Sequence, residues 1–186
     1  MRTGMFESFA TRHWFSDAAK RIWSDEATLQ CWLDVESALA LSQAELGLIP
    51  QDAAQVIQSR ANAAHFDLDA LADEIAFAQH PLVPVLRRFE ALCGEPAAGY
   101  IHWGATTQNI FDTANALQMQ GTHRLLAGHL DAALHHACEL VARHADTPMA
   151  GRTHGQHALP MTFGLKVAGW IDELARHRER LSLRLE

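Results

Sequence analysis

The spacing of hydrophobic positions predicts helices along most of the first half of the chain. Between residues 24 and 46, apolar side chains recur at intervals of three and four, as on one face of an amphipathic helix. Ser24 precedes this run as a capping residue, and Gly47 followed by Pro50 is a typical helix stop. Further helices are expected at 51–64, 67–80 and 85–92, after an irregular aromatic arm over residues 1–20 that ends in a short helix.

The second half of the chain predicts two longer helices. One begins at Thr106 or Thr107 and runs to about residue 144, and the other runs from residue 163 to the end. Gly121 and Gly128 lie inside the first, where each costs about 1 kcal/mol relative to alanine, so we expect close packing against another helix there. Helices of this length are typical of bundles.

The predicted fold class is therefore all-α, since no segment shows convincing strand alternation. Glycine and proline cluster between residues 93 and 99, which predicts a domain boundary. We expect an N-terminal helical domain over residues 1–98 and the first part of a helical-bundle domain over residues 99–186. The last pattern stops without a cap at Leu185 and Glu186, which predicts a truncated chain.

Composition narrows the classes of partner. The 186 residues carry a formal net charge of -7 without blocks of like charge, which argues against nucleic acid or an anionic membrane as a partner. Three well-separated cysteines suggest neither a disulfide framework nor a thiolate zinc site. No signal peptide or membrane-spanning run is recognisable. These features predict a cytoplasmic protein, and a small anionic ligand remains compatible with them.

The densest polar cluster lies between the two long helices, at residues 151–160. We expect a polar loop in which His154 donates or accepts a proton near neutral pH. Arg152 can bind a carboxylate through two hydrogen bonds, and Thr153 and Gln156 add further polar groups. The alternative, a loop histidine that only hydrogen-bonds the backbone, stays open.

A second polar cluster, at residues 102–109, opens the first long helix. The free N–H groups of a helix N-terminus, with His102 and the hydroxyls of Thr106 and Thr107, form a natural binding site for a carboxylate or a phosphate. The alternative is that one threonine is simply the N-cap. We expect the two clusters to belong to one site, while His80 before Pro81 either faces that site or caps a helix end.

Metal and cofactor sites are not favoured. His135 with Glu139, and His154 with His157, have suggestive spacings, but no third ligand is evident. The chain also lacks a glycine-rich phosphate loop and a Gly-x-Ser-x-Gly motif. We therefore expect no metal and no cofactor, with most histidines of the long helix on a solvated face.

Two motifs resemble those of a known family. Gly-Arg-Thr-His-Gly-Gln-His-Ala-Leu-Pro-Met-Thr-Phe-Gly-Leu-Lys (151–166) and His-Trp-Gly-Ala-Thr-Thr-Gln-Asn-Ile-Phe-Asp-Thr (102–113) are similar to two of the three motif regions of the fumarase/aspartase superfamily. The resemblance extends over nearly the whole chain. Its nearest branches are adenylosuccinate lyase and 3-carboxy-cis,cis-muconate cycloisomerase.

The resemblance implies a mechanism and an assembly. His154 matches the general acid of adenylosuccinate lyases, His80 matches a substrate-site histidine, and Thr106 and Thr107 match a substrate-binding Thr-Ser pair. Such enzymes remove a proton next to a carboxylate, break a C–N or C–O bond and release fumarate. They are all-α homotetramers whose sites are built from three subunits.

Three departures from the family pattern matter. Asn109 stands where both branches usually have aspartate, and no Arg-Tyr pair for a nucleotide phosphate is evident near residues 12–14. The third motif, a Ser-Ser loop that supplies the base, is absent from this chain. We therefore expect this chain alone to lack turnover.

The predicted function is β-elimination of fumarate from a succinyl-amine substrate. Its first alternative is a cycloisomerase acting on a tricarboxylate-like muconate. The second is a helical assembly fragment without catalysis.

Overall fold

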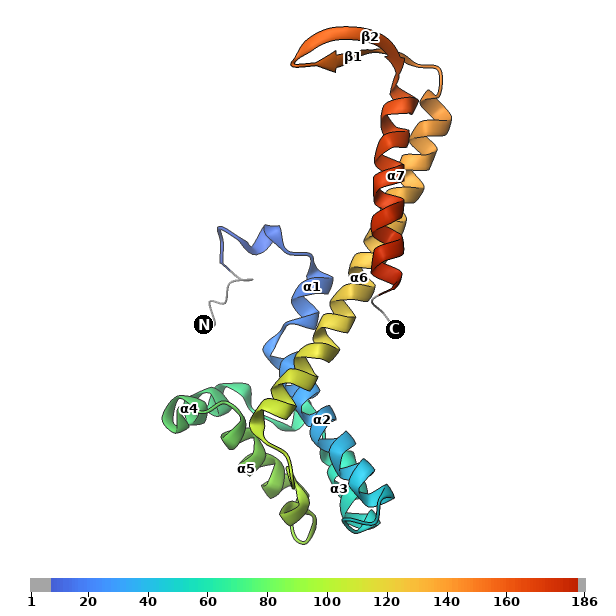
Figure 1. Cartoon of the computed structure of the whole chain (residues 1–186). Helices are drawn as coiled ribbons and strands as arrows, with labels where there is room; N and C mark the ends of the chain where they lie inside the picture. Colours follow the sequence, from blue (N-terminus) through green and yellow to red (C-terminus); the bar gives the residue numbers. More distant parts are fainter. Residues whose placement is uncertain (1–7, 184–186) are drawn as a thin grey trace. The chain divides into compact units, whose positions relative to one another are not determined.

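The computed structural model describes residues 8–183, which fold into helices and one small antiparallel hairpin (Figure 1). The chain divides into two compact units, Met1–Met119 and Gln120–Glu186, and the division falls within the long helix α6, Thr107–His144. The all-α class is confirmed by this architecture. The domain boundary at residues 98 and 99 stays a prediction.

Helices α1 and α2 begin and end where their capping residues place them. α1 (Asp17–Ile22) and α2 (Asp25–Glu45) are each preceded by a serine whose hydroxyl accepts a backbone N–H of the first turn. At the end of α2, the N–H of Leu48 bonds the carbonyl of Gln43 and that of Gly47 bonds Ala44. This is the Schellman arrangement, and Gly47 permits it at φ 71°. The predicted stop at Gly47 is confirmed.

The predicted helix 51–64 ends earlier than expected. α3 spans Gln51–Arg60, and a separate 3-10 turn covers Ala63–His65. Gln30 of α2 stabilises the break, because its side chain donates to the Ala61 carbonyl at 3.0 Å and accepts the Ala63 N–H at 2.9 Å. A partner 33 positions away along the chain thus replaces helical hydrogen bonds, and no local pattern announces it.

The next two helices meet at His80. α4 (Leu68–Ala78) ends at Gln79, which adopts a left-handed conformation with φ 52°, so the expected extension to residue 80 is wrong. α5 (Leu82–Cys93) starts three residues earlier than predicted. Pro84 does not prevent this, because it lies in the first turn, where a missing N–H leaves no helical bond unmade.

The core of the first unit is formed by residues from α2, α3, α4, α5 and the start of α6, together with residues of the segments that connect them. These side chains are almost fully removed from solvent, and their burial supplies the main stabilising term for the unit. Its members are Leu29, Leu33, Ala40, Ile49, Ala53, Ala54, Ile57, Ala63, Phe66, Leu71, Leu82, Val85, Phe89, Ala97, Ile101 and Ile110.

The second unit consists of the rest of α6, the strands β1 (Pro148–Thr153) and β2 (Gln156–Thr162), and α7 (Phe163–Ser182). In Figure 1 the last part of α6 and α7 run side by side in opposite directions. The ion pair between Arg178 and Asp131 joins the two helices at 2.7 Å. The predicted loop at 151–160 is therefore corrected to a hairpin, and the expectation of no strand is wrong. The predicted end of the last helix falls partly on residues 184–186, outside the described range.

Close helix packing occurs at Gly164, which was not one of the two glycines expected to provide it, and the expectation for Gly121 stays a prediction. A Cβ at Gly164 would lie 2.8 Å from both the Ala145 Cα and the His144 carbonyl oxygen, so α7 contacts the end of α6 there. A Cβ at Gly128 meets no atom within 4 Å. The close approach predicted at Gly128 is therefore not made within the described chain. Over residues 8–183, no helix has the length and hydropathy required to cross a membrane.

The contact at Gly164 gives a paired prediction. Gly164→Ala should lower the thermal unfolding midpoint, because the new methyl group meets fixed backbone atoms and overpacking costs about 1–3 kcal/mol. Gly169→Ala, in the same helix but with nothing within 4 Å, should raise the midpoint slightly, because alanine is about 0.5–1 kcal/mol better than glycine in a helix. Circular dichroism melts of both variants test this, and equal effects at the two positions would contradict the packing.

Candidate active site

His154 lies at the tip of a tight hairpin turn. The strands pair Thr153 with Gln156, so His154 and Gly155 form a two-residue connection. Their φ angles are 48° and 75°. Two consecutive positive φ values define the type I′ turn, which matches the twist of the flanking strands. Glycine adopts this conformation freely, whereas histidine does so only where the structure imposes it.

The hairpin depends on Gly151 for its register. The strand pairing shifts between Ala150 and Arg152, which places Gly151 in an irregularity of the ladder. A Cβ there would lie 2.9 Å from the Leu159 carbonyl oxygen, closer than a side chain tolerates. Glycine at this position therefore allows the two strands to approach.

Arg152 contacts the opposite strand through a histidine. Its Nη2 lies 3.3 Å from His157 Nε2. Because a guanidinium only donates, this contact requires His157 Nε2 to accept, with the ring proton on Nδ1. Arg152, Thr153, His154 and Gln156 are all exposed. The hairpin therefore presents these four side chains to solvent. Any surface that excludes water from them must be formed by residues outside the hairpin.

His102 is held in place by a buried carboxylate. Its Nδ1 lies 2.6 Å from Glu36 Oε1, and the His102 backbone is left-handed with φ 60°. The neighbouring Trp103 carbonyl accepts a hydrogen bond from Gln43 Nε2 at 2.6 Å. Glu36 and Gln43 lie two turns apart on α2, so one face of this helix fixes the loop that carries His102.

The threonine pair opens α6 as a capped helix start. The helix begins at Thr107, and the Asn109 side chain accepts the Thr106 N–H at 3.0 Å. A side chain that reaches back in this way from the third helical residue is half of a capping box. Thr106 therefore occupies the N-cap position of α6, which was the alternative to a binding role in the sequence analysis. This contact also gives Asn109 a role where the resembling branches have aspartate.

His80 also contacts the backbone of a helix start. Its Nδ1 accepts the N–H of Val83 in the first turn of α5 at 3.3 Å. An accepting Nδ1 places the ring proton on Nε2, so this histidine presents a donor. His80 therefore caps the N-terminus of α5, and not the C-terminus of α4. A substrate contact through Nε2 stays a prediction.

The predicted residues form two groups. His102, Thr106 and Thr107 come together at the start of α6, in the unit that also contains His80. Arg152, Thr153, His154 and Gln156 come together in the hairpin of the other unit. A single site built from both groups stays a prediction.

Glu36 was not among the predicted site residues, although it contacts His102. Leu29, Leu33, Glu36 and Ala40 are all buried on one face of α2. An acidic residue in such a series is a recognisable signal, because buried carboxylates need partners. Burial raises the pKa of Glu36, while the hydrogen bond, charge and backbone of His102 act to lower it.

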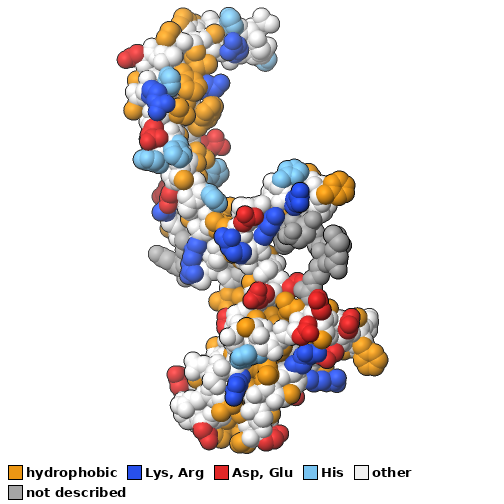
Figure 2. Space-filling view, turned by 180° about the vertical axis from the view of Figure 1, so that it is seen from behind, with side chains coloured by type: hydrophobic (Ala, Val, Ile, Leu, Met, Phe, Trp, Pro, Cys, Tyr) orange, Lys and Arg blue, Asp and Glu red, His pale blue; other side chains and the backbone are white. Residues whose placement is uncertain are grey.

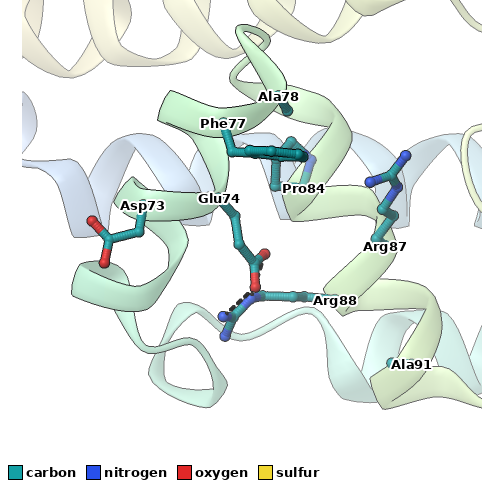
Figure 3. Close-up of a pocket in the computed structure, with 8 residues that line it drawn as sticks. All are labelled: Asp73, Glu74, Phe77, Ala78, Pro84, Arg87, Arg88 and Ala91. Carbon is teal, nitrogen blue, oxygen red and sulfur yellow. Dashed lines mark hydrogen bonds and ion pairs between the residues drawn. The ribbon is translucent and has the colours of Figure 1, made fainter.

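A hollow of about 500 Å³ lies between α4 and α5 (Figure 3). Glu74 and Arg88, which both line it, form an ion pair in which Arg88 Nη2 lies 2.7 Å from Glu74 Oε1. Phe77, on its rim, is 92% exposed. None of the predicted site residues lines this hollow, so it is not part of the candidate active site. Its lining residues are Asp73, Glu74, Phe77, Ala78, Pro84, Arg87, Arg88 and Ala91.

The histidines of α6 show a partial cluster. Glu139 lies 3.5 Å from His135 Nε2 and 3.2 Å from His136 Nδ1, and all three side chains are exposed. Among the described residues, no group of three or more potential ligands is arranged to hold a metal ion.

Comparisons with known proteins give a consistent result. The sequence model of a family described as lyase matches residues 12–185. The N-acetyl-S-(2-succino)cysteine lyase of Dickeya dadantii is 43% identical over 150 residues, which cover 81% of this chain and 33% of that protein. The adenylosuccinate lyase of Pyrococcus abyssi is 43% identical over 149 residues, with 80% and 33% covered.

A solved structure extends the likeness to the fold. The 3-carboxy-cis,cis-muconate lactonizing enzyme of Pseudomonas putida superimposes with a TM-score of 0.87 at 37% identity, covering 94% of this chain and 40% of that one. The chain spans about a third of the length of the curated relatives it matches.

The Glu74–Arg88 pair predicts a pH effect on stability. The hydrogen bond from Arg88 holds the pKa of Glu74 below its usual value. A carboxyl group with a lowered pKa in the folded state stabilises the fold above its unfolded pKa of about 4.3, and this stabilisation is lost as the pH falls through the folded value. Wild type should therefore exceed Glu74→Gln in thermal midpoint at pH 7, and the two should converge towards pH 3.

Melting curves from pH 7 to pH 3 measure this difference. The matched control is Glu90→Gln, an exposed carboxylate on α5 for which no ion pair occurs within residues 8–183. A gap between wild type and Glu74→Gln that stays constant with pH would contradict the prediction. The expected effect is small because both partners are partly exposed.

Proposed function

The chain belongs to the fumarase/aspartase superfamily of lyases, and on this premise we propose that the protein releases fumarate from a succinyl-amine substrate by β-elimination. The reaction removes a proton from the carbon next to a carboxylate. The electron pair forms the C=C bond while the C–N bond on the adjacent carbon breaks. The departing nitrogen takes up a proton.

The observation that carries this proposal is His154 at the exposed tip of the type I′ turn. In our proposal His154 is the general acid that protonates the leaving nitrogen. Arg152, on the same hairpin, binds a substrate carboxylate through its guanidinium. Thr153 and Gln156 pair across the turn and add polar contacts beside the reacting group.

The other group of residues binds the rest of the substrate in this proposal. Thr106 and Thr107 stand at the N-terminus of α6, where the helix dipole and free N–H groups favour a carboxylate. His102 and His80 contribute ring nitrogens. The substrate is thus a small anionic dicarboxylate or tricarboxylate, and no step requires a metal or a cofactor.

The base that removes the proton is not assigned to any residue of this chain. In our proposal it comes from protein beyond these 186 residues, because the resembling third motif is not among them. The chain alone would then bind substrate weakly and show no turnover.

We also propose a homotetramer for the full-length protein. Hydrophobic side chains remain exposed on the helices of the second unit, including Leu126, Leu165 and Trp170, and orange side chains mark the surface in Figure 2. A hollow of about 820 Å³ between α6 and α7 is lined partly by leucines. Helices from other copies would cover these surfaces. A cytoplasmic location fits the three free cysteines.

A second candidate is the muconate cycloisomerase reaction. It is favoured by the superposition on the Pseudomonas putida enzyme over 94% of this chain. The same His154 would then act on a lactone oxygen instead of a leaving nitrogen. The choice depends on the substrate and not on the fold.

The test follows fumarate release by the full-length protein. The substrates are adenylosuccinate, N-acetyl-S-(2-succino)cysteine and simpler succinyl amines, with carboxymuconate lactone interconversion assayed in parallel. His154→Ala should lower kcat by about 10²- to 10⁴-fold, the range for loss of a general acid.

The matched control is His65→Ala, an exposed histidine outside both groups of site residues. It should leave kcat within a factor of two or so of wild type. Fumarate release that survives in His154→Ala would overturn the assignment of the acid. Lactone interconversion without fumarate would move the protein to the cycloisomerase reaction, and inactivity in both assays would leave only a helical assembly role.

A further inference from the structure

Glu36 is a buried acid, and one of its two carboxyl oxygens lacks a hydrogen-bond partner among the described residues. The residue is 3% exposed and lies in the hydrophobic series of α2. Its Oε1 contacts His102 Nδ1 at 2.6 Å, and its Oε2 has no hydrogen-bond partner within the described residues. An unpaired buried carboxylate oxygen is costly, so this arrangement needs a reason beyond packing.

A ring nitrogen and a carboxylate oxygen 2.6 Å apart need a hydrogen between them. When the ring is neutral and Glu36 is ionised, that hydrogen lies on Nδ1, and the ring Nε2 is an acceptor. When Glu36 is protonated it donates to Nδ1, and the ring hydrogen lies on Nε2. The second arrangement holds one proton more than the first, as does an imidazolium paired with the carboxylate. The first arrangement is therefore the one expected at alkaline pH, after the pair has released that proton.

We propose that Glu36 is a positioning residue for His102: its carboxylate accepts a hydrogen bond from the Nδ1–H of the neutral ring, so that the ring presents Nε2 as a hydrogen-bond acceptor to the substrate. The His102 side chain is 20% exposed, so it retains access to solvent on one side. The second contact from α2, between Gln43 and the Trp103 carbonyl, prevents the loop from turning the ring away.

The two histidines of this unit then differ in what they offer. His80 accepts the Val83 N–H at Nδ1 and presents an Nε2 donor. His102 donates from Nδ1 and presents an Nε2 acceptor. A ligand group with an N–H or O–H suits His102, whereas a carboxylate suits His80. This inference rests on the proposed function for the identity of the substrate, where the succinyl-amine N–H is the group that His102 would accept.

The tautomer of His102 is the direct test. Two-bond ¹H–¹⁵N NMR spectra of the ¹⁵N-histidine-labelled chain at pH 8 separate a protonated from an unprotonated Nδ1, and the His102→Asn spectrum assigns the signal. We expect Nδ1 protonated and Nε2 bare in the wild type. A bare Nδ1 would overturn the proposal, because Glu36 would then be the donor.

Substitution shows whether Glu36 is the cause. In Glu36→Leu the Nδ1-protonated form should give way to the Nε2-protonated form that prevails in free histidine. If the leucine variant fails to fold, Glu36→Gln replaces it, because glutamine keeps the size of the side chain and one acceptor oxygen. In Glu36→Gln, His102 should be a mixture of the two tautomers. The control is Glu74→Gln, which removes a carboxylate of the same unit that pairs with Arg88 and not with His102, and which should leave the His102 tautomer unchanged. An unchanged His102 tautomer in a folded Glu36 variant would also overturn the proposal.

Activity of the full-length protein adds a second readout. Glu36→Gln should lower kcat/KM by up to about 100-fold through misplacement of His102, with little further loss in the double variant with His102→Asn. Independent, multiplicative losses would contradict a positioning role. The tautomer result does not depend on the reaction. If the tautomer is confirmed but no fumarate is released, the proposed function is contradicted and the role of Glu36 still holds.

Discussion

Backbone strain is concentrated at the histidines of the candidate site. Within residues 8–183, the residues other than glycine with positive φ are Gln79, His102 and His154. Two are predicted site residues, and Gln79 directly precedes a third, His80. Each such conformation costs of order 1–3 kcal/mol and persists only where surrounding contacts impose it. The fold must therefore hold these three points.

Each strained point is held by a different device. At His154 the strand pairing of Thr153 with Gln156 imposes the turn, and Gly151 allows the strands to come close enough. At His102 the buried carboxylate of Glu36 holds the ring. At Gln79 the side chain donates to the Ala76 carbonyl at 2.6 Å, which closes the end of α4. The first device is local in sequence, whereas the second links residues 66 positions apart.

That difference explains how much the sequence could predict. The helices follow from hydrophobic spacing, and the end of α2 follows from Gly47, since both signals are local. The hairpin was missed because its turn carries His-Gly in place of the usual Asn-Gly, and because none of its strand residues is buried, so no alternation of buried and exposed positions appears. The early end of α3 was missed because Gln30 supplies its hydrogen bonds from another helix. Glu36 was visible as an acid among core positions, but its partner was not.

The two strained histidines differ in how far they are shielded from water. The geometry of the His154 turn is complete within the hairpin, because pairing and a glycine suffice to impose it. Its chemistry is not complete, because an exposed histidine and arginine act in water, where electrostatic stabilisation is weak. His102 shows the reverse condition, since its Nδ1 side is already desolvated by Glu36. In the proposed site, a surface that excludes water from the hairpin would strengthen the interactions of these side chains, and exposed hydrophobic side chains on α6 and α7, among them Leu126, Leu165 and Trp170, are suited to attract such a surface.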